Sequence, residues 1–251
     1  MVETKTSDLN IGPSYRHRIR TQALTVFPVR VKETDLLVYA KKDLTAVTTD
    51  LVLKYRGHIE AYIKTHPEFG ASLSPLNICE PVPRIIRDMF QAAKKAGVGP
   101  MAAVAGAIAQ RVGLDILSLP DGSSEVIIEN GGDIFIKAEN PITVGLYAGK
   151  SPLSFKIGLQ IRSDTAPVAV CTSSGTVGHS LSFGKADAVC VVSTSCPFAD
   201  AVATAIGNLI RSEKDIPKGI AHGRQMKGVT GLLVVVGSKM GIWGELELVR
   251  V

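Results

Sequence analysis

Cys196-Pro-Phe-Ala-Asp-Ala-Val-Ala-Thr-Ala-Ile-Gly-Asn208 is the stretch of this chain that says most about its fold. The pattern predicts a helix over 197–210, in which Asp200 and Thr204 lie four residues apart and therefore share one face. A carboxylate and a hydroxyl are hard oxygen donors. Stacked near the start of a helix, they suit Mg²⁺ with a phosphate close by.

The same stretch also has a purely structural interpretation. Ser195 could cap the helix, Pro197 suits its first turn, and Asp200 would complement the helix dipole without any metal. The Thr204 hydroxyl could bond back to a carbonyl one turn earlier. Taken by itself, the stretch favours this structural interpretation.

The composition is that of a globular protein. The chain has 251 residues, of which 45% are hydrophobic and 20% charged, enough for a large core. We expect a single domain over 1–251, with a polar and basic segment over 1–20, an N-terminal half over 21–120 and a strand-rich half over 121–251. The net charge of +5 suits an anionic small molecule of the nucleotide type. It is too small to predict a nucleic-acid partner, and only 5% of residues are aromatic.

No segment of the sequence resembles an export signal or a membrane span. Residues 1–10 are polar, and no apolar run approaches the roughly 20 residues that cross a bilayer. These features predict a cytoplasmic protein without a membrane partner. The cysteines lack the paired spacing of a zinc site, and reduced thiols are expected for all four: Cys79, Cys171, Cys190 and Cys196.

Helices and strands are expected in an order that favours an α+β or mixed α/β fold with mixed sheets, rather than a regular βαβ alternation. Helices are predicted over 44–64, 84–96, 101–112 and 197–210. Strands are predicted over 22–31, 35–40, 125–129, 134–138, 143–147, 154–161, 167–171, 188–192, 232–236 and 246–251. Residues 65–83 and 214–228 are expected to be loops.

Two glycine-containing segments offer candidate ligand contacts. In Asn130-Gly-Gly-Asp133, Gly131 and Gly132 permit positive φ and close backbone approach, and Asp133 could orient a ligand. An ordinary tight turn needs the same residues. The segment Cys171-Thr-Ser-Ser-Gly-Thr-Val-Gly-His179 could hold phosphate oxygens through its backbone N–H groups, or be a plain loop.

In order along the chain, these segments resemble the ApbE flavin transferase superfamily. Asn130-Gly-Gly-Asp133 is similar to its Gly-Gly-Asp, Thr172-Ser-Ser-Gly175 to its Thr-Ser-Gly, and Ala199-Asp-Ala-Val-Ala-Thr204 to its Ala-Asp-Ala-x-Ala-Thr. A weaker match is Gly99–Ala109. The resemblance implies an ApbE-like fold with packed helices and a central cleft between its halves.

The resemblance also implies a chemistry. Members bind FAD and Mg²⁺, cleave the diphosphate and transfer FMN to a protein hydroxyl, and some hydrolyse FAD instead. Carried over, Asp200, Thr204 and the Ala105 carbonyl would hold Mg²⁺. The residues that would contact FAD or FMN are Gly131, Gly132, Asp133, Thr172, Ser174, Gly175 and His179.

Departures from the family pattern leave catalysis open. Ala105-Gly106-Ala107 stands where the family has Ala-Lys-Gly, so the lysine is missing, and Arg111 replaces a later aspartate. Ser182 stands where the family has a catalytically important aspartate, and a hydroxyl is no general base without activation. His179 and Ser182 are therefore the candidate catalytic residues, without an assigned role.

The departures are similar to those of the short cytoplasmic ApbE-like proteins of archaea and some anaerobic bacteria. That branch is associated with sulfide assimilation into homocysteine, which implies a protein partner in sulfur metabolism and makes Cys171 or Cys190 candidate sulfur carriers. Two functions thus stay open: a Mg²⁺-dependent enzyme acting on FAD, and a non-catalytic member that binds a ligand or a partner. A homo-oligomer is also compatible with the sequence.

Overall fold

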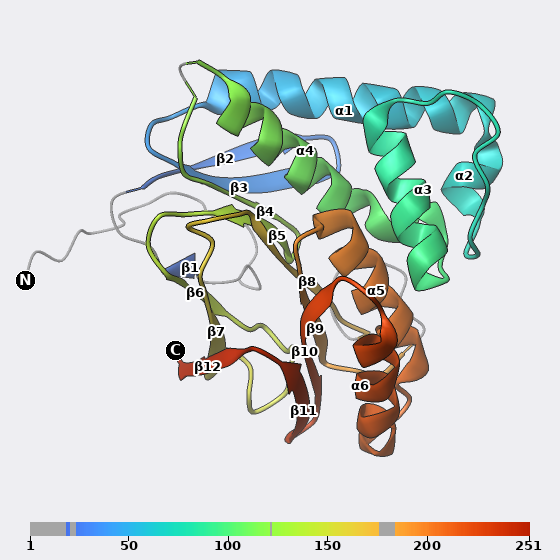
Figure 1. Ribbon diagram of the computed structural model, residues 1–251, viewed down its shortest axis with the longest axis vertical. Coiled ribbons are helices and arrows are strands. Elements are labelled where there is room, and N and C mark those ends of the chain that lie inside the picture. Colours follow the sequence, from blue (N-terminus) through green and yellow to red (C-terminus); the bar gives the residue numbers. More distant parts are fainter. Residues whose placement is uncertain (1–18, 21–23, 121, 176–183) are drawn as a thin grey trace, which may run out of the picture.

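Two antiparallel sheets and a layer of helices make up the part of the chain that the computed structural model describes, residues 19–20, 24–120, 122–175 and 184–251 (Figure 1). The helices lie on one face of the larger sheet, and the smaller sheet lies on the other. The candidate site is built where the helices meet the larger sheet.

The larger sheet has eight strands in the order β11-β10-β9-β8-β5-β4-β3-β2. All ladders among its described strands are antiparallel, so the predicted α+β class is confirmed while the expectation of mixed sheets is wrong. Tight turns join β2 to β3, β4 to β5 and β10 to β11, helices lie between β3 and β4 and between β9 and β10, and two strands of the smaller sheet lie between β5 and β8. The strands of the larger sheet are β2 Thr25–Val31, β3 Thr34–Ala40, β4 Val126–Asn130, β5 Asp133–Lys137, β8 Val168–Ser173, β9 Ala188–Ser193, β10 Val229–Val236 and β11 Lys239–Gly244.

The smaller sheet has four strands in the order β1-β6-β7-β12, also antiparallel. Apolar side chains from this sheet pack against the far face of the larger one, as Leu159 and Ile134 illustrate, and form one core. The strands of this sheet are β1 Ile19–Arg20, β6 Ile142–Gly145, β7 Ile157–Ile161 and β12 Glu247–Arg250.

The helices cover the opposite face of the eight-stranded sheet and form the second core with it. Phe135 of β5 points into this core, whereas its neighbour Ile134 points into the other, as the two-residue period of a strand requires. The helices are α1 Thr45–Thr65, α2 Pro67–Ala71, α3 Arg84–Ala96, α4 Val104–Ser118, α5 Cys196–Leu209 and α6 Ile216–Gln225, with 3₁₀ turns η1 Pro100–Ala103 and η2 Glu213–Asp215.

Most predicted elements are confirmed, and the misses have a common cause. Both predicted loops contain a helix, α2 in the first and α6 in the second, and strand β11 was not predicted. In α6, Gly219 and Gly223 suggest a loop, yet both face packed side chains. A Cβ at Gly219 would lie 2.7 Å from Ile210, and one at Gly223 would lie 2.6 Å from Leu232. Close packing on the core therefore outweighs the low helix propensity of glycine.

The segment Pro100–Ser118, comprising η1 and α4, is the one helical segment of the described residues that is long and apolar enough to cross a membrane. Half of its most apolar window is buried inside the protein. Core helices pass the same test, and α4 packs directly on β4 and α5.

Candidate functional site

The N-terminal turns of α4 and α5 meet at the face of the eight-stranded sheet. Asp200 lies in the second turn of α5, and its Oδ2 accepts a hydrogen bond of 2.9 Å from the backbone N–H of Gly106 in the first turn of α4. Asp200 therefore does not cap its own helix. It satisfies an orphan donor at the start of the neighbouring helix, where a negative charge is favourable.

Gly106 is what allows the two helices to come this close. A Cβ at this position would lie 2.5 Å from the carbonyl oxygen of Cys196 and 3.0 Å from Cβ of Asp200. The contact is with backbone, which cannot move aside as a flexible side chain could. The missing lysine at this position thus has a structural reason, because no side chain fits there.

The carbonyl of Ala105, one of the predicted metal ligands, lies beside the end of β4. Its oxygen accepts a hydrogen bond of 3.0 Å from Nδ2 of Asn130. This bond orients the group, whose regular helical partner is the N–H of Ala109, so a metal ion at this oxygen would have to share it with these two donors. Asn130 has a positioning role that the sequence did not predict, although it belongs to the quoted Gly-Gly-Asp segment.

The turn that follows Asn130 has the expected conformation. Gly131 and Gly132 have φ values of 64° and 107°, a region that side chains disfavour. Asp133, which follows them, is only 7% exposed and lies directly opposite Cys171 in the ladder of β5 and β8. Since opposite residues of a ladder point to the same face, Asp133 and Cys171 both point toward the helices.

Asp133 is buried and Asp200 is partly buried, and the two acids lie close enough for the charge of Asp200 to affect Asp133. Burial, followed by the charge of Asp200, raises the pKa of Asp133 well above its usual value, and the nearby thiol of Cys171 opposes this only in part. Burial also raises the pKa of Asp200 to about 7, against the opposing hydrogen bonds from Gly106 and Ala105. Two such carboxyls must share a proton or face a cation.

Thr204 and Ser173 add hydroxyl groups to the face of this site. Thr204, one turn after Asp200, is 9% exposed, and its hydroxyl has no hydrogen bond to the rest of the described chain. Ser173, on the same face of β8 as Cys171, has a buried Oγ that lacks a partner among the described residues. A buried hydroxyl without a partner is costly, so the position of Ser173 favours a polar ligand.

These donors fit Mg²⁺ by their chemistry. Carboxylate, carbonyl and hydroxyl oxygens are the ligands that this hard cation prefers. Within the described ranges, no three or more His, Cys, Asp or Glu side chains gather as a metal cluster. Any cation here would thus be held by the acids together with hydroxyl, carbonyl and phosphate oxygens, an arrangement usual for Mg²⁺.

The cysteines form a different arrangement from the one predicted for sulfur carriers. Sγ of Cys171 lies 3.6 Å from Sγ of Cys196, and both side chains are fully buried. Burial raises the pKa of both thiols, and it raises that of Cys190 to about 11. The reactive form of a thiol is the thiolate, so none of the three is set up as a nucleophile at neutral pH.

The remaining predicted ligand and catalytic residues lie on β8, directly after it, or outside the described part of the chain. Thr172 points to the opposite face of β8 from Cys171, toward Cys190, and only its backbone N–H reaches the turn, donating to the carbonyl of Gly132 at 3.1 Å. Ser174 and Gly175 follow β8 directly. The catalytic candidates His179 and Ser182 lie outside the described residues.

The start of α5 is capped differently from the structural interpretation of the sequence. Ser195 occupies the capping position, but its side chain makes no capping bond, and Oε1 of Gln110 instead accepts from the N–H of Cys196 at 2.8 Å. Pro197 lies in the first turn, as expected. The signal in the sequence that could have indicated this contact is Gln110, a polar residue in the middle of a largely apolar helix.

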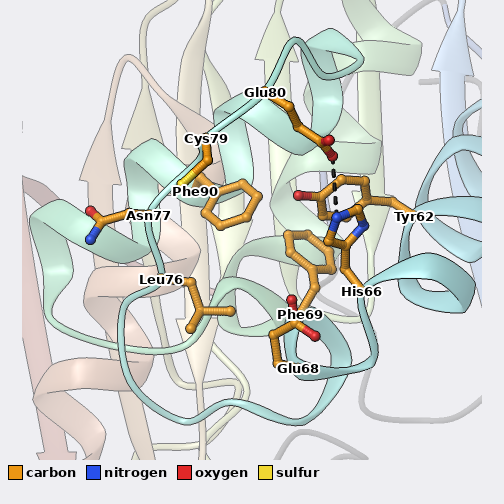
Figure 2. A pocket seen from close by; sticks show the side chains of 9 residues that line it. All are labelled: Tyr62, His66, Glu68, Phe69, Leu76, Asn77, Cys79, Glu80 and Phe90. Carbon is orange, nitrogen blue, oxygen red and sulfur yellow. Dashed lines mark ion pairs between the residues drawn. The ribbon is translucent and has the colours of Figure 1, made fainter.

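A cavity of about 210 Å³ lies apart from this site, between α1, α3 and the segment that joins α2 to α3. Figure 2 shows His66 beside Tyr62, with which its ring stacks at 4.2 Å, and facing Glu80, whose Oε1 lies 3.2 Å from Nε2. Phe69 and Phe90 form its floor. None of the predicted site residues lines it, and the central cleft implied by the resemblance stays a prediction.

The layered sheets and the helix arrangement are those of the ApbE-like fold. The fold matches a mutant of "Flavin Transferase ApbE from Vibrio cholerae" with a TM-score of 0.57 and 11% identity, over 88% of this chain and 96% of that one. The chain belongs to the family described as "AbpE bacteria", which matches residues 16–236.

The family assignment is supported by relatives from archaea that share the name "UPF0280 protein". One from Methanococcus aeolicus is 42% identical over 199 residues, which cover 78% of this chain and 79% of the relative. Another from Methanocella arvoryzae is 38% identical over 222 residues, 88% of this chain and 89% of the relative. The predicted resemblance, including its archaeal branch, is thereby confirmed.

Proposed function

We propose that this protein binds a flavin nucleotide, FAD or FMN, together with Mg²⁺, at the meeting point of α4, α5 and the Gly131-Gly132 turn. The observation that carries the proposal is the acid pair formed by Asp133, which is buried, and Asp200, which is partly buried. Their pKa values are raised by burial, and no cationic side chain of the described chain is among the groups that shift them. A divalent cation would compensate this charge.

The parts of the site have separable roles in this proposal. Asp200, Thr204 and the Ala105 carbonyl would hold Mg²⁺, and Asn130 and Gly106 would position two of these ligands. Gly131 and Gly132 would let the nucleotide approach the backbone, and Asp133 would contact the flavin or the cation. Once bound, Mg²⁺ neutralises diphosphate oxygens and the charge of a leaving group.

The choice of a flavin rests on the superfamily, since solved members of this fold carry the name flavin transferase. Cleavage of the FAD diphosphate, or transfer of FMN to a protein hydroxyl, is the activity to be tested. A nucleotide with a diphosphate also matches the net charge of +5.

A non-catalytic binding role is the second candidate, and one observation favours it. Gly106 leaves no room for the side chain that the family has there, since a Cβ would lie 2.5 Å from the Cys196 carbonyl. Such a protein would bind its nucleotide without turnover. A role in sulfide assimilation and homocysteine formation, with a partner protein in the cytoplasm, stays a prediction, and the raised thiol pKa values argue against Cys171 and Cys190 as the sulfur carriers.

The test is FAD binding by isothermal calorimetry with and without Mg²⁺, combined with an assay for AMP. We expect binding that requires Mg²⁺ and is weakened at least tenfold in Asp200→Asn. Asp187→Asn is the matched control, because Oδ2 of Asp187 also accepts from a backbone N–H, that of Gly237, away from the acid pair. Release of AMP would identify an enzyme, and binding without AMP the second candidate. If FAD and FMN do not bind at millimolar Mg²⁺, the proposal is wrong.

A further inference from the structure

The two ends of the eight-stranded sheet differ in a way that bears on assembly. β2 and β11 are the outermost described strands of this sheet. An open strand edge pairs with other chains unless it is blunted. The β2 edge carries a residue that hinders such pairing, whereas the β11 edge does not.

The β2 edge is closed by a proline. β2 and β3 are joined by a two-residue turn, so the closing pair Val31 and Thr34 exchanges hydrogen bonds and every second pair after it does the same. Pro28 belongs to the alternate set, whose backbone N–H positions point away from β3 and out of the sheet. Proline removes the donor at the centre of this edge.

The β11 edge keeps all of its donors. β10 and β11 are also joined by a two-residue turn, which closes on Val236 and Lys239. By the same alternation, Met240, Ile242 and Gly244 direct their N–H groups away from β10, as Met240 and Ile242 do their carbonyls, whereas the Gly244 carbonyl accepts from the N–H of Leu246 at 3.1 Å. β11 contains no proline, and its described neighbours are β10 and α6.

The side chains of this edge are also unusual. Gly241 faces α6, where a Cβ would lie 2.4 Å from Ile216, so Met240 and Ile242 point to the other face. They are 45% and 42% exposed, which places two of the exposed large apolar side chains of the described chain side by side on one strand. The exposed apolar face and the open backbone edge coincide.

We propose that β11 pairs antiparallel with β11 of a second copy of this chain, with Ile242 on the two-fold axis. In that register Ile242 faces Ile242 of the partner subunit, and each exchanges backbone hydrogen bonds through the groups that point outward. The exposed apolar faces of both copies then adjoin across the axis.

The charged residues at the two ends of β11 favour pairing with a second copy of this chain over pairing with a strand of another protein. Lys239 begins β11 and Glu245 directly follows its last residue, and both are exposed, so antiparallel pairing brings Lys239 of each chain to the end where the other carries Glu245. The strand is therefore complementary to itself, as a two-fold interface requires. Opposite charges facing each other across a ladder stabilise it, and like charges oppose it. Gly244, with φ of 94°, ends the strand at this point and sends the chain toward β12.

Analytical ultracentrifugation of the full chain between about 1 and 100 µM tests the pairing. We expect a reversible dimer of the unmodified protein. Ile242→Pro removes only an outward donor, as Pro28 does in β2, and should give a monomer with unchanged circular dichroism. Ile242→Val is the matched control and should remain a dimer.

Charge reversal gives a second test that leaves the backbone intact. Lys239→Glu should weaken the dimer about tenfold, because each interface contains the pair twice, and adding Glu245→Lys in the same chain should restore it. A wild-type monomer at 100 µM overturns the proposal. A dimer that neither Ile242→Pro nor Lys239→Glu weakens also overturns it, because the contact must then lie elsewhere. These results are independent of flavin binding, which is measured separately.

Discussion

The backbone N–H of Gly106 and Oδ2 of Asp200 lie 2.9 Å apart, so one hydrogen bond ties the first turn of α4 to the second turn of α5. The acid that the sequence marks as a metal ligand is thus also a cap of the neighbouring helix. Both roles use the same carboxylate, whose two oxygens have more acceptor sites than the bonds from Gly106 and Ala105 occupy. The structural and the functional interpretations of Asp200 are therefore compatible.

Gly106→Ala should separate these two helices. The added Cβ would lie 2.5 Å from the Cys196 carbonyl, and we expect a loss of about 1–3 kcal/mol in the free energy of unfolding, measured by urea denaturation. Gly57→Ala in α1 is the control, because a Cβ there has no atom within 4 Å. It should stabilise the protein by about 0.5–1 kcal/mol. Equal effects of the two changes would contradict the close approach.

The stability of the protein should depend on pH through Asp200. Burial raises its pKa from 3.8 to about 7, so its contribution favours the folded state below pH 4 and is lost as the pH rises through 7. In the absence of divalent cations, Asp200→Asn should therefore gain stability relative to the wild type between pH 5 and pH 8. Unfolding in urea with EDTA measures this, and Mg²⁺ should cancel the gain at pH 8. A pH-independent difference would refute the assignment.

Thr204→Val separates ligand binding from folding. Its hydroxyl has no described hydrogen bond, so the isosteric valine should leave the unfolding free energy within about 0.5 kcal/mol. Mg²⁺-dependent nucleotide binding should nevertheless weaken about tenfold. Thr48→Val in α1 is the comparison, because Oγ1 of Thr48 is buried without a described partner and lies outside the candidate site, so binding should not change. Equal nucleotide affinity in both variants would exclude Thr204 as a ligand.

The thiols should react in a fixed order. Cys79 is exposed, whereas Cys171, Cys190 and Cys196 are buried and their pKa values raised by burial. Titration with a disulfide reagent should therefore modify one thiol in the native protein and four in denaturant. Cys79→Ser should abolish the native reaction. Rapid native modification of Cys171 or Cys190 would restore them as candidate sulfur carriers.

The sequence correctly predicted the helices and strands whose apolar residues recur with the spacing that their packing in the fold requires. The hairpin of β2 and β3 and the helices α1, α3 and α5 all have regular apolar spacing, and each lies close to its predicted bounds. Helix α6 and strand β11 were missed because Gly219, Gly223 and Gly241 suggest loops. Each of these glycines is there because a packed neighbour leaves no room for a Cβ, which only the folded structure shows.

The sequence predicted some residues of the candidate site but not the hydrogen bonds that hold them in place. Resemblance to a family located Asp133, Asp200 and Thr204, and the structure brings the two acids together. It could not reveal that Asn130 and Gln110 hold the Ala105 carbonyl and the Cys196 N–H, because these bonds join residues 25 and 86 positions apart. That the chain forms a single domain stays a prediction.

The acid pair should couple the binding of a metal ion to the release of a proton. Because burial raises the pKa of Asp200 to about 7, and also raises that of Asp133 well above its usual value, the site is partly protonated at neutral pH. A cation that binds here must displace the carboxyl proton, so metal binding should release on the order of one proton per site. The heat of binding would then vary with the ionisation enthalpy of the buffer, and a falling pH would empty the site without unfolding the protein.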